Sequence, residues 1–123
     1  MKTFKYGEDF LKSSTAIAIA RGEIQGILST ETIDNINRSA AHVQKIVAKG
    51  DVVYGINTGF GPLCTTLIDA DDTRKLQENI LKSHAVGIGE PIDKELSKLM
   101  LILKVHALAK GFSGVQLSTI ARI

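Results

Sequence analysis

The chain has 123 residues, of which 44% are hydrophobic and 23% are charged, and a formal net charge of +2 at pH 7. This length and composition suit one globular domain with a moderate core, and the intermixed acidic and basic residues form no basic stripe for nucleic acid or a membrane surface. Cys64 is the only cysteine, so an internal disulfide is excluded and a reducing, cytoplasmic location is expected.

The N-terminal part predicts one short helix. Residues 1–5 lead into mixed polar sequence, whereas a signal peptide would continue into an apolar core. One of the hydroxyl side chains at positions 13–15 is expected to cap a helix that continues to Ala20. Gly22 would stop this helix, because glycine readily adopts the left-handed backbone found at helix ends.

A longer helix is predicted from about Thr30 to Lys49. Ser29 or Thr30 would cap its first turn, and Gly50 would end it. Apolar residues recur at spacings of three and four, which is typical of a helix with one buried face. That face would carry Ile33, Ile36, Ala40, Val43 and Val47.

The middle of the chain predicts an extended segment, a glycine-rich loop and another helix. Residues 51–54 are β-prone, and the loop follows over residues 54–61. The carboxylates of residues 69–72 stand where the dipole of a new helix favours negative charge. This helix would carry Leu76 and Ile80 on its apolar face and would end before the glycines at 87 and 89.

The last long helix is expected to begin around Pro91, with acidic residues in its first turn and Gly111 just beyond its end. Its buried face would carry Leu96, Leu99, Met100, Leu103 and Ala107. Residues 116–123 resemble a helix that has just begun, which favours a chain cut from a longer protein. The fold expected for residues 1–123 is therefore mainly α, with minor extended segments, forming a single N-terminal domain or fragment.

The loop at 54–61, Tyr-Gly-Ile-Asn-Thr-Gly-Phe-Gly, is the most distinctive segment. Its glycines allow unusual backbone conformations and close approach to a ligand, while Asn57 and Thr58 offer local hydrogen bonds. No Lys-Ser/Thr pair follows, so a phosphate-binding loop is not indicated. Two interpretations remain for Tyr54: an amphipathic side chain beside a tight turn, or a phenol that acts as an acid or base.

His84 also has two interpretations. It extends the apolar face of the helix that ends before the glycines at 87 and 89. In the first interpretation it is a helix cap or a packed histidine. In the second it faces a cavity and binds a polar ring of a substrate. His42 has polar helical neighbours and is expected to be solvated, whereas His106 is expected to be packed. The histidines and the cysteine lack metal-ligand spacings such as H-x-x-x-H, so no metal site is predicted.

Three ordered segments resemble the histidine/phenylalanine/tyrosine ammonia-lyase family. They are the loop at 54–61, the segment Leu-Gln-Glu-Asn-Ile-Leu-Lys-Ser-His-Ala-Val-Gly-Ile-Gly-Glu-Pro at 76–91, and Ala-Leu-Ala-Lys-Gly-Phe-Ser-Gly-Val at 107–115. The Ser-His-Ala context of His84 is similar to the branch of the family that acts on L-histidine. One departure is that Lys-Val-His at 104–106 replaces the family's usual Arg-x-Asn, which puts local packing or assembly contacts in doubt.

The resemblance implies a helical fumarase/aspartase-like ammonia-lyase fold and nonoxidative elimination of ammonia from L-histidine to give trans-urocanate. By the match, Tyr54 would be the base that removes the β-proton, His84 would bind the substrate ring, and Gly61 would lie beside the substrate. The family uses a 4-methylideneimidazole-5-one prosthetic group formed autocatalytically from Ala-Ser-Gly. It assembles as a homotetramer whose active sites combine residues of several subunits.

The chain itself contains no Ala-Ser-Gly, since none of its eleven alanines is followed by serine. We therefore expect these 123 residues to be inactive alone. Two alternatives remain: a fragment of a tyrosine or phenylalanine ammonia-lyase or an aminomutase, and a non-enzymatic helical interaction module.

Overall fold

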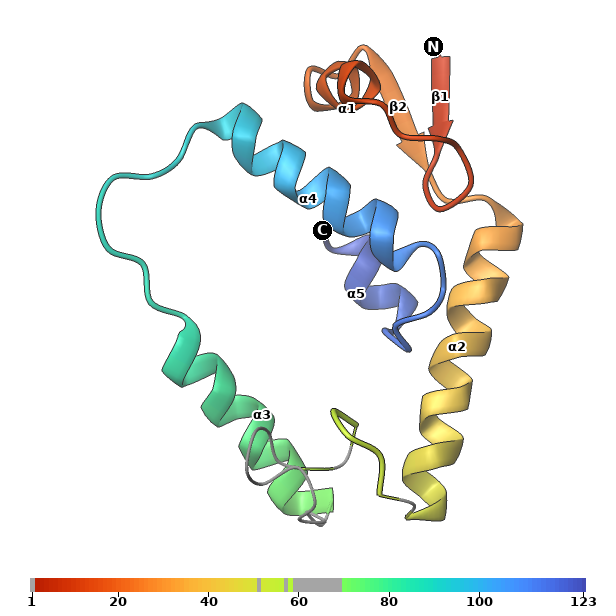
Figure 1. Cartoon of the computed structure of the whole chain (residues 1–123), viewed down its shortest axis with the longest axis vertical. Coiled ribbons are helices and arrows are strands. Elements are labelled where there is room, and N and C mark those ends of the chain that lie inside the picture. Colours follow the sequence, from red (N-terminus) through yellow and green to blue (C-terminus); the bar gives the residue numbers. More distant parts are fainter. Residues whose placement is uncertain (1, 51, 57, 59–69) are drawn as a thin grey trace. The chain divides into compact units, whose positions relative to one another are not determined.

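The computed structural model describes residues 2–50, 52–56, 58 and 70–123. The chain divides into two compact units (Figure 1). The first comprises Met1–His42 and Pro91–Ile123, and the second comprises Val43–Glu90. The elements in chain order are β1 (Lys2–Lys5), α1 (Ser13–Ala20), β2 (Ile24–Ile27), α2 (Thr30–Lys49), α3 (Ala70–His84), α4 (Lys94–Leu108) and α5 (Leu117–Ala121). The prediction of a mainly helical chain is confirmed. None of the described helices is long and apolar enough to cross a membrane.

Two short strands near the N-terminus were missed by the sequence reasoning. β1 and β2 pair in parallel, with Phe4 opposite Gly26, and α1 is the crossover that a parallel pair requires. Gly26 lies against the Tyr6 ring, where an added Cβ would fall 2.3 Å from a ring carbon. Each strand has four residues, too few for an alternating pattern to distinguish them from a loop.

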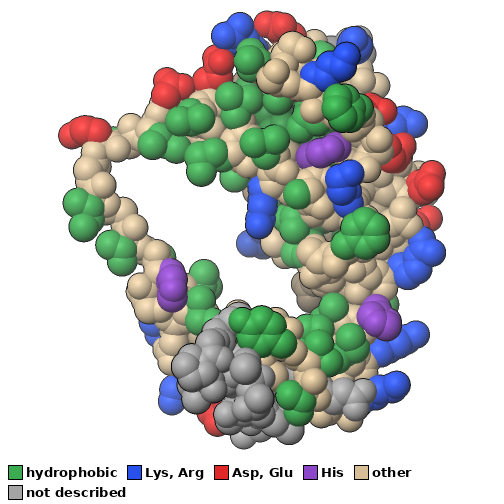
Figure 2. Space-filling view, viewed as in Figure 1, with side chains coloured by type: hydrophobic (Ala, Val, Ile, Leu, Met, Phe, Trp, Pro, Cys, Tyr) green, Lys and Arg blue, Asp and Glu red, His purple; other side chains and the backbone are tan. Residues whose placement is uncertain are grey.

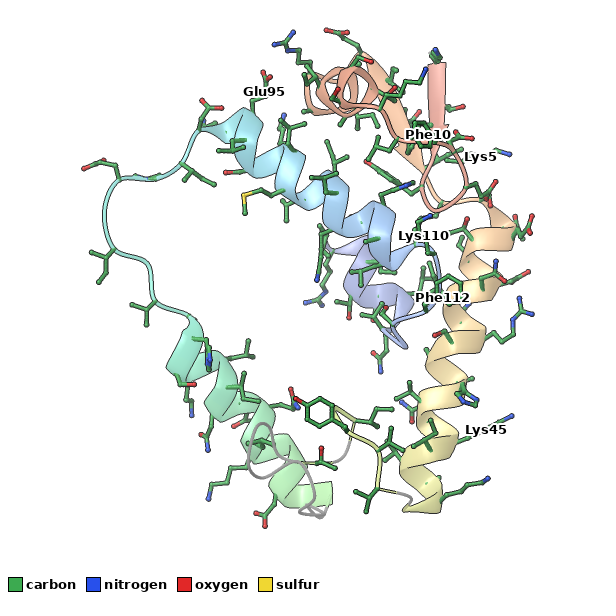
Figure 3. All side chains as sticks on the ribbon, viewed as in Figure 1. Lys5, Phe10, Lys45, Glu95, Lys110 and Phe112 are labelled. Carbon is green, nitrogen blue, oxygen red and sulfur yellow. The ribbon has the colours of Figure 1, made fainter. Side chains whose placement is uncertain are left out.

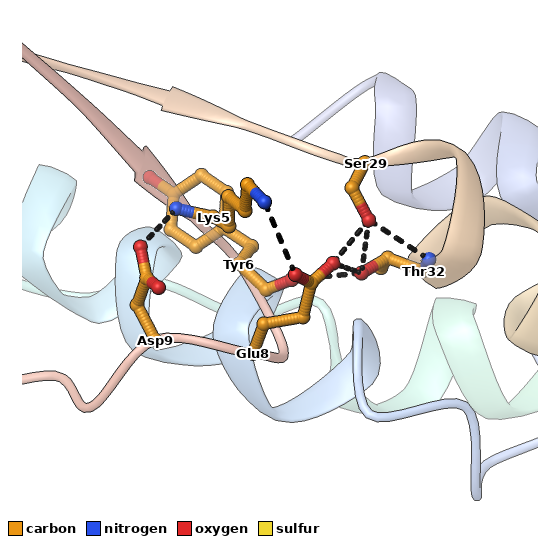
Figure 4. A network of polar contacts seen from close by, with 6 residues as sticks. All are labelled: Lys5, Tyr6, Glu8, Asp9, Ser29 and Thr32. Atoms are coloured by element: carbon orange, nitrogen blue, oxygen red, sulfur yellow. Dashed lines mark hydrogen bonds and ion pairs between the residues drawn. The ribbon is translucent and has the colours of Figure 1, made fainter.

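The bounds predicted for α2 are confirmed, and its first turn is held by a polar network (Figure 4). Ser29 Oγ accepts a hydrogen bond from the Thr32 amide at 3.1 Å, so Ser29 is the cap. The Ser29 and Thr32 hydroxyls both donate to the Glu8 carboxylate, and these bonds hold the pKa of that carboxyl below its usual range. Gly50 ends the helix with a φ of 72°.

The expected cap of α1 was wrong. Lys12 occupies the cap position in extended backbone, and no side chain there bonds the first turn. The expected stop at Gly22 is confirmed by its φ of 77° and by its amide, which donates to the Ile19 carbonyl at 3.0 Å. The hydroxyl residues at positions 13–15 therefore lie inside the helix, and none of them caps its first turn.

The predicted buried face of α4 was also wrong. Ile102 is buried against Ala16 and Ala20 of α1, and Leu99 is partly buried beside them. The other members of the predicted face are exposed, namely Leu96 (50%), Met100 (57%), Leu103 (57%) and Ala107. Figure 2 shows hydrophobic side chains gathered over α4. Because α4 is apolar on nearly every side, its periodicity does not indicate which face packs inward.

The start of α4 differs by three residues from the prediction. Asp93 is its cap and accepts hydrogen bonds from the Glu95 amide at 2.7 Å and the Leu96 amide at 3.3 Å. Pro91 precedes this cap and lies outside the helix. The helix is followed by Gly111 with a φ of 74°, as expected. The side-chain cap fixes the start because it satisfies amides that the helix leaves unpaired.

Candidate functional site

Tyr54 lies in a tight turn of the second unit. The Ile56 amide donates to the Val53 carbonyl at 3.1 Å, and the Gly55 amide donates to Thr58 Oγ1 at 3.3 Å. Gly55 has a φ of 77°, which other residues rarely adopt. Thr58 is buried, whereas Tyr54 is 66% exposed. The turn therefore exposes Tyr54, while the buried Thr58 holds the turn in place through its hydrogen bond from the Gly55 amide.

The sequence predictions for this segment are only partly confirmed. Thr58 makes the local hydrogen bond expected of it. The extended segment expected at 51–54 is not found among its described residues, since Val52 and Val53 form no strand and Tyr54 belongs to the turn. Asn57, Gly61 and Cys64 lie outside the described residues.

His84 is the last residue of α3, which ends before the glycines as predicted. Its Nδ1 lies 2.8 Å from Ser83 Oγ and 3.0 Å from the Ile80 carbonyl oxygen. A proton on Nδ1 would be donated to that carbonyl, which is the geometry of a helix C-cap. The exposed ring would then offer Nε2 to a ligand. The capping and ligand-binding interpretations are therefore compatible.

Ser83 is the residue beside this site that the sequence reasoning missed. Its hydroxyl donates to the Ile80 carbonyl at 3.0 Å, and its oxygen is within hydrogen-bond distance of the His84 ring. A serine directly before a helix-terminal histidine is a recognisable signal, because short hydroxyl side chains bond carbonyls one turn earlier. Ser83 thus helps to set the orientation of the His84 ring.

The other histidines behave as predicted. His42 is exposed on α2. His106 is partly buried, and its Nδ1 accepts a hydrogen bond from the Gly7 amide at 3.2 Å, with its ring centroid 5.6 Å from that of Phe4. Burial lowers the pKa of His106, Lys110 lowers it further, and Asp9 acts in the opposite direction. Within the described part of the chain, no three His, Cys, Asp or Glu side chains converge on a metal-sized site.

A sequence profile described as "Aromatic amino acid lyase" matches residues 11–123. The chain belongs to this family. The membership confirms the resemblance carried by the segments at 54–61, 76–91 and 107–115, all of which lie inside the matched range. Tyr54 and His84 therefore stand within the family-matched part of the chain, and both belong to the second unit.

Relatives within the aromatic amino acid lyase family include curated proteins named histidine ammonia-lyase. The protein from Salmonella arizonae is 47% identical over 102 residues, which cover 83% of this chain and 20% of that protein. The protein from Salmonella typhimurium is 43% identical over 120 residues, which cover 98% of this chain and 24% of that protein. The chain thus spans between a fifth and a quarter of the length of these relatives.

Solved structures give the same fold. Histidine ammonia-lyase from Trypanosoma cruzi matches with a TM-score of 0.83 at 32% identity, over 99% of this chain and 23% of that one. Tyrosine aminomutase from Streptomyces globisporus matches with a TM-score of 0.86 at 22% identity, over 98% of this chain and 23% of that one. The predicted helical ammonia-lyase fold is confirmed by these neighbours.

Proposed function

We propose that this chain is the N-terminal part of a histidine ammonia-lyase, a carbon–nitrogen lyase that converts L-histidine to trans-urocanate and ammonia. The observation that carries the proposal is the 43–47% identity to proteins of that name. The aminomutase named above is 22% identical, a level that supports the fold alone. The substrate proposed here is therefore L-histidine rather than tyrosine or phenylalanine.

Tyr54 is proposed as the general base. Elimination requires a proton to leave the β-carbon while the bond between the α-carbon and the amino nitrogen breaks, which leaves a carbon–carbon double bond and ammonia. A phenolate can accept that proton if it is held within reach of the β-carbon. The turn formed by Gly55 and Thr58 supports this role, because it holds an exposed phenol on a constrained backbone. The phenolate would need stabilisation from residues beyond this turn.

His84 is proposed to bind the imidazole ring of the substrate. Its Nδ1 faces the helix end, so Nε2 would be the atom that exchanges a hydrogen bond with the substrate ring. Gly61 is proposed to lie beside the substrate, where a side chain would intrude. These three residues would bind and orient the amino acid and would remove its β-proton.

The family's 4-methylideneimidazole-5-one group would supply the electrophile that activates the amino group for departure. This chain cannot form the group by itself, because it lacks the Ala-Ser-Gly from which the group is made. The proposal assigns that tripeptide to a further part of the protein and predicts that residues 1–123 alone are inactive. The complete enzyme is proposed to be a cytoplasmic homotetramer.

The decisive experiment is a substrate assay of the full-length protein that contains this chain. L-histidine, L-tyrosine and L-phenylalanine would be supplied separately, and the unsaturated acid product would be followed by ultraviolet absorbance. Turnover of L-histidine to urocanate, with little turnover of the other two, is the expected result. Preference for L-tyrosine would show that the proposed substrate, L-histidine, is wrong. Formation of β-amino acid products would indicate an aminomutase. No turnover of any of them would favour an interaction module.

A further inference from the structure

A second candidate site lies in the first unit, away from Tyr54 and His84 in the sequence. A surface pocket of about 480 Å³ is lined by one face of α2, at positions 35, 38, 39 and 42, and by residues 110–112 after α4. The α2 positions follow helical spacings of three and four, so they share one side of the helix. Figure 3 labels Lys110 and Phe112 in the segment that follows α4.

Two contacts hold the walls of this pocket together. The Gly114 amide donates to Ser39 Oγ at 3.0 Å. Gly111, with a φ of 74°, approaches α2 so closely that an added Cβ would lie 3.1 Å from the Asn35 carbonyl carbon. The segment after α4 is therefore fixed against α2 by one hydrogen bond and one close backbone approach. A site whose walls are fixed in this way binds a ligand at a lower entropic cost.

The lining is cationic. Arg38 and Lys110 contribute positive charges, and the described residues of the lining include no carboxylate. Among the described residues, neither Arg38 nor Lys110 forms an ion pair, whereas Arg21 pairs with Glu95 at 3.3 Å. Arg38 does contact the Asn35 side-chain oxygen. Its charge nevertheless has no acidic partner in that part of the chain.

Lys110 also borders a neighbouring pocket that contains Glu8 and Asp9. Both carboxylates are occupied elsewhere: Glu8 accepts from Ser29 and Thr32, and Asp9 accepts from the Lys5 amide at 2.7 Å. They therefore reduce the positive potential around Lys110 without pairing with it. The cationic character of the pocket that includes Arg38 is retained.

Phe112 lines the same pocket and is 91% exposed. An aromatic face beside an arginine and a lysine matches a ligand that combines a planar ring with a negative group, because the ring stacks while the guanidinium binds two oxygens. We propose that this pocket binds a small aromatic oxyanion, in which a phosphate or carboxylate group lies between Arg38 and Lys110 and the ring lies against Phe112. The inference does not depend on the function proposed for Tyr54 and His84.

The test is isothermal titration of the intact protein with phenyl phosphate, benzoate and inorganic phosphate in separate experiments. Saturable binding of phenyl phosphate or benzoate is expected, and their relative affinity would identify the preferred oxyanion. Arg38→Gln and Lys110→Gln should each weaken binding about tenfold or more, as for the loss of a charge-assisted hydrogen bond. Phe112→Ala should weaken phenyl phosphate binding but leave the weaker binding of inorganic phosphate unchanged.

Lys45→Gln is the matched control, since Lys45 is an exposed cation of the same helix that does not line the pocket. It should leave binding unchanged. Arg38→Lys retains the charge and should bind more tightly than Arg38→Gln, which separates charge from a folding defect. The absence of saturable binding by all three ligands would overturn the proposal. An equal loss of affinity in Lys45→Gln would also overturn it, because binding would then reflect overall charge.

Discussion

The buried core and the two candidate site residues Tyr54 and His84 lie in different units of this chain. The buried hydrophobic residues of the described chain all belong to the first unit, and they are Phe4, Ala16, Ala20, Ile36, Ile102, Ala109 and Ile120. In the second unit, Tyr54 is 66% exposed, and Leu81, Val86 and Ile88 are also exposed. Hydrophobic residues stabilise a fold when they are buried away from water. Catalytic and binding residues must instead be accessible to a ligand.

The residues that indicate function contribute little to the buried core that stabilises the fold. Tyr54 and His84 are set by local contacts, namely a turn bonded to Thr58 and a helix end. Ile36 is only 1% exposed, and it stands in a segment that no functional motif marks. Substitutions in the two units should therefore separate activity from stability.

The largest expected effect is that of Tyr54→Phe in the full-length enzyme. Removal of a general base typically costs 10² to 10⁴-fold in turnover, so a loss of about that size is expected. The thermal unfolding midpoint should change little by comparison, because Tyr54 is 66% exposed. Steady-state kinetics and calorimetry on the same preparation would check both points. Normal turnover by this variant would exclude Tyr54 as the base.

The next effect concerns the core of the first unit. Ile36→Ala should lower the free energy of unfolding by about 2–5 kcal/mol, because it removes buried methyl groups and leaves a cavity. Val47→Ala on the same helix is the control. Val47 is 49% exposed, so a change within about 0.5 kcal/mol is expected. Urea denaturation of the intact protein would measure both, and equal losses would contradict the deeper burial of Ile36.

A smaller effect is expected where β2 meets the Tyr6 ring. Gly26→Ala places a Cβ 2.3 Å from that ring, so the ring must move at a cost of about 1–3 kcal/mol. Gly87→Ala in the second unit is the matched control, since no atom of the described residues, its chain neighbours aside, lies within 4 Å of its added Cβ. The unfolding midpoints of the two variants give the comparison. A neutral Gly26→Ala would mean that the strand pair is easily displaced.

The smallest effect is the pH dependence contributed by His106. Its pKa is lowered in the folded protein, chiefly by burial, so the unfolded chain takes up a proton first as the pH falls through about 6.5. Stability should therefore decrease as the pH falls through about 6.5 and should level off below the lowered pKa. Protonation would also remove the acceptor for the Gly7 amide.

His106→Gln should reduce this pH dependence, whereas His42→Gln should leave it intact, because His42 is exposed. Urea unfolding at several pH values would check the difference. The range should stay above about pH 5, because the lowered pKa of Glu8 makes that carboxylate lose its contribution only in more acid solution. Identical pH profiles for the two variants would contradict the role assigned to His106.

Local signals in the sequence predicted the helices well. The bounds of α2, its Ser29 cap and its Gly50 end follow from residues within one or two turns of each position. The same holds for the end of α3 at His84. Capping and left-handed glycines depend on neighbouring residues only, so a single sequence contains the information they need. Tyr54 and His84 were likewise visible as candidates, while their roles remain proposals.

The sequence by itself determined the helical elements, several of their ends and the family resemblance, because each of these depends on short-range pattern. Only the tertiary structure decided that Ile102 of α4 packs inward while Leu96 and Met100 stay exposed, and that β1 pairs with β2. It also brought Arg38 of α2 and Lys110 to one pocket. The physical reason is that these features depend on contacts between residues distant in sequence, and an apolar helix or a four-residue strand does not indicate locally which partner it will meet.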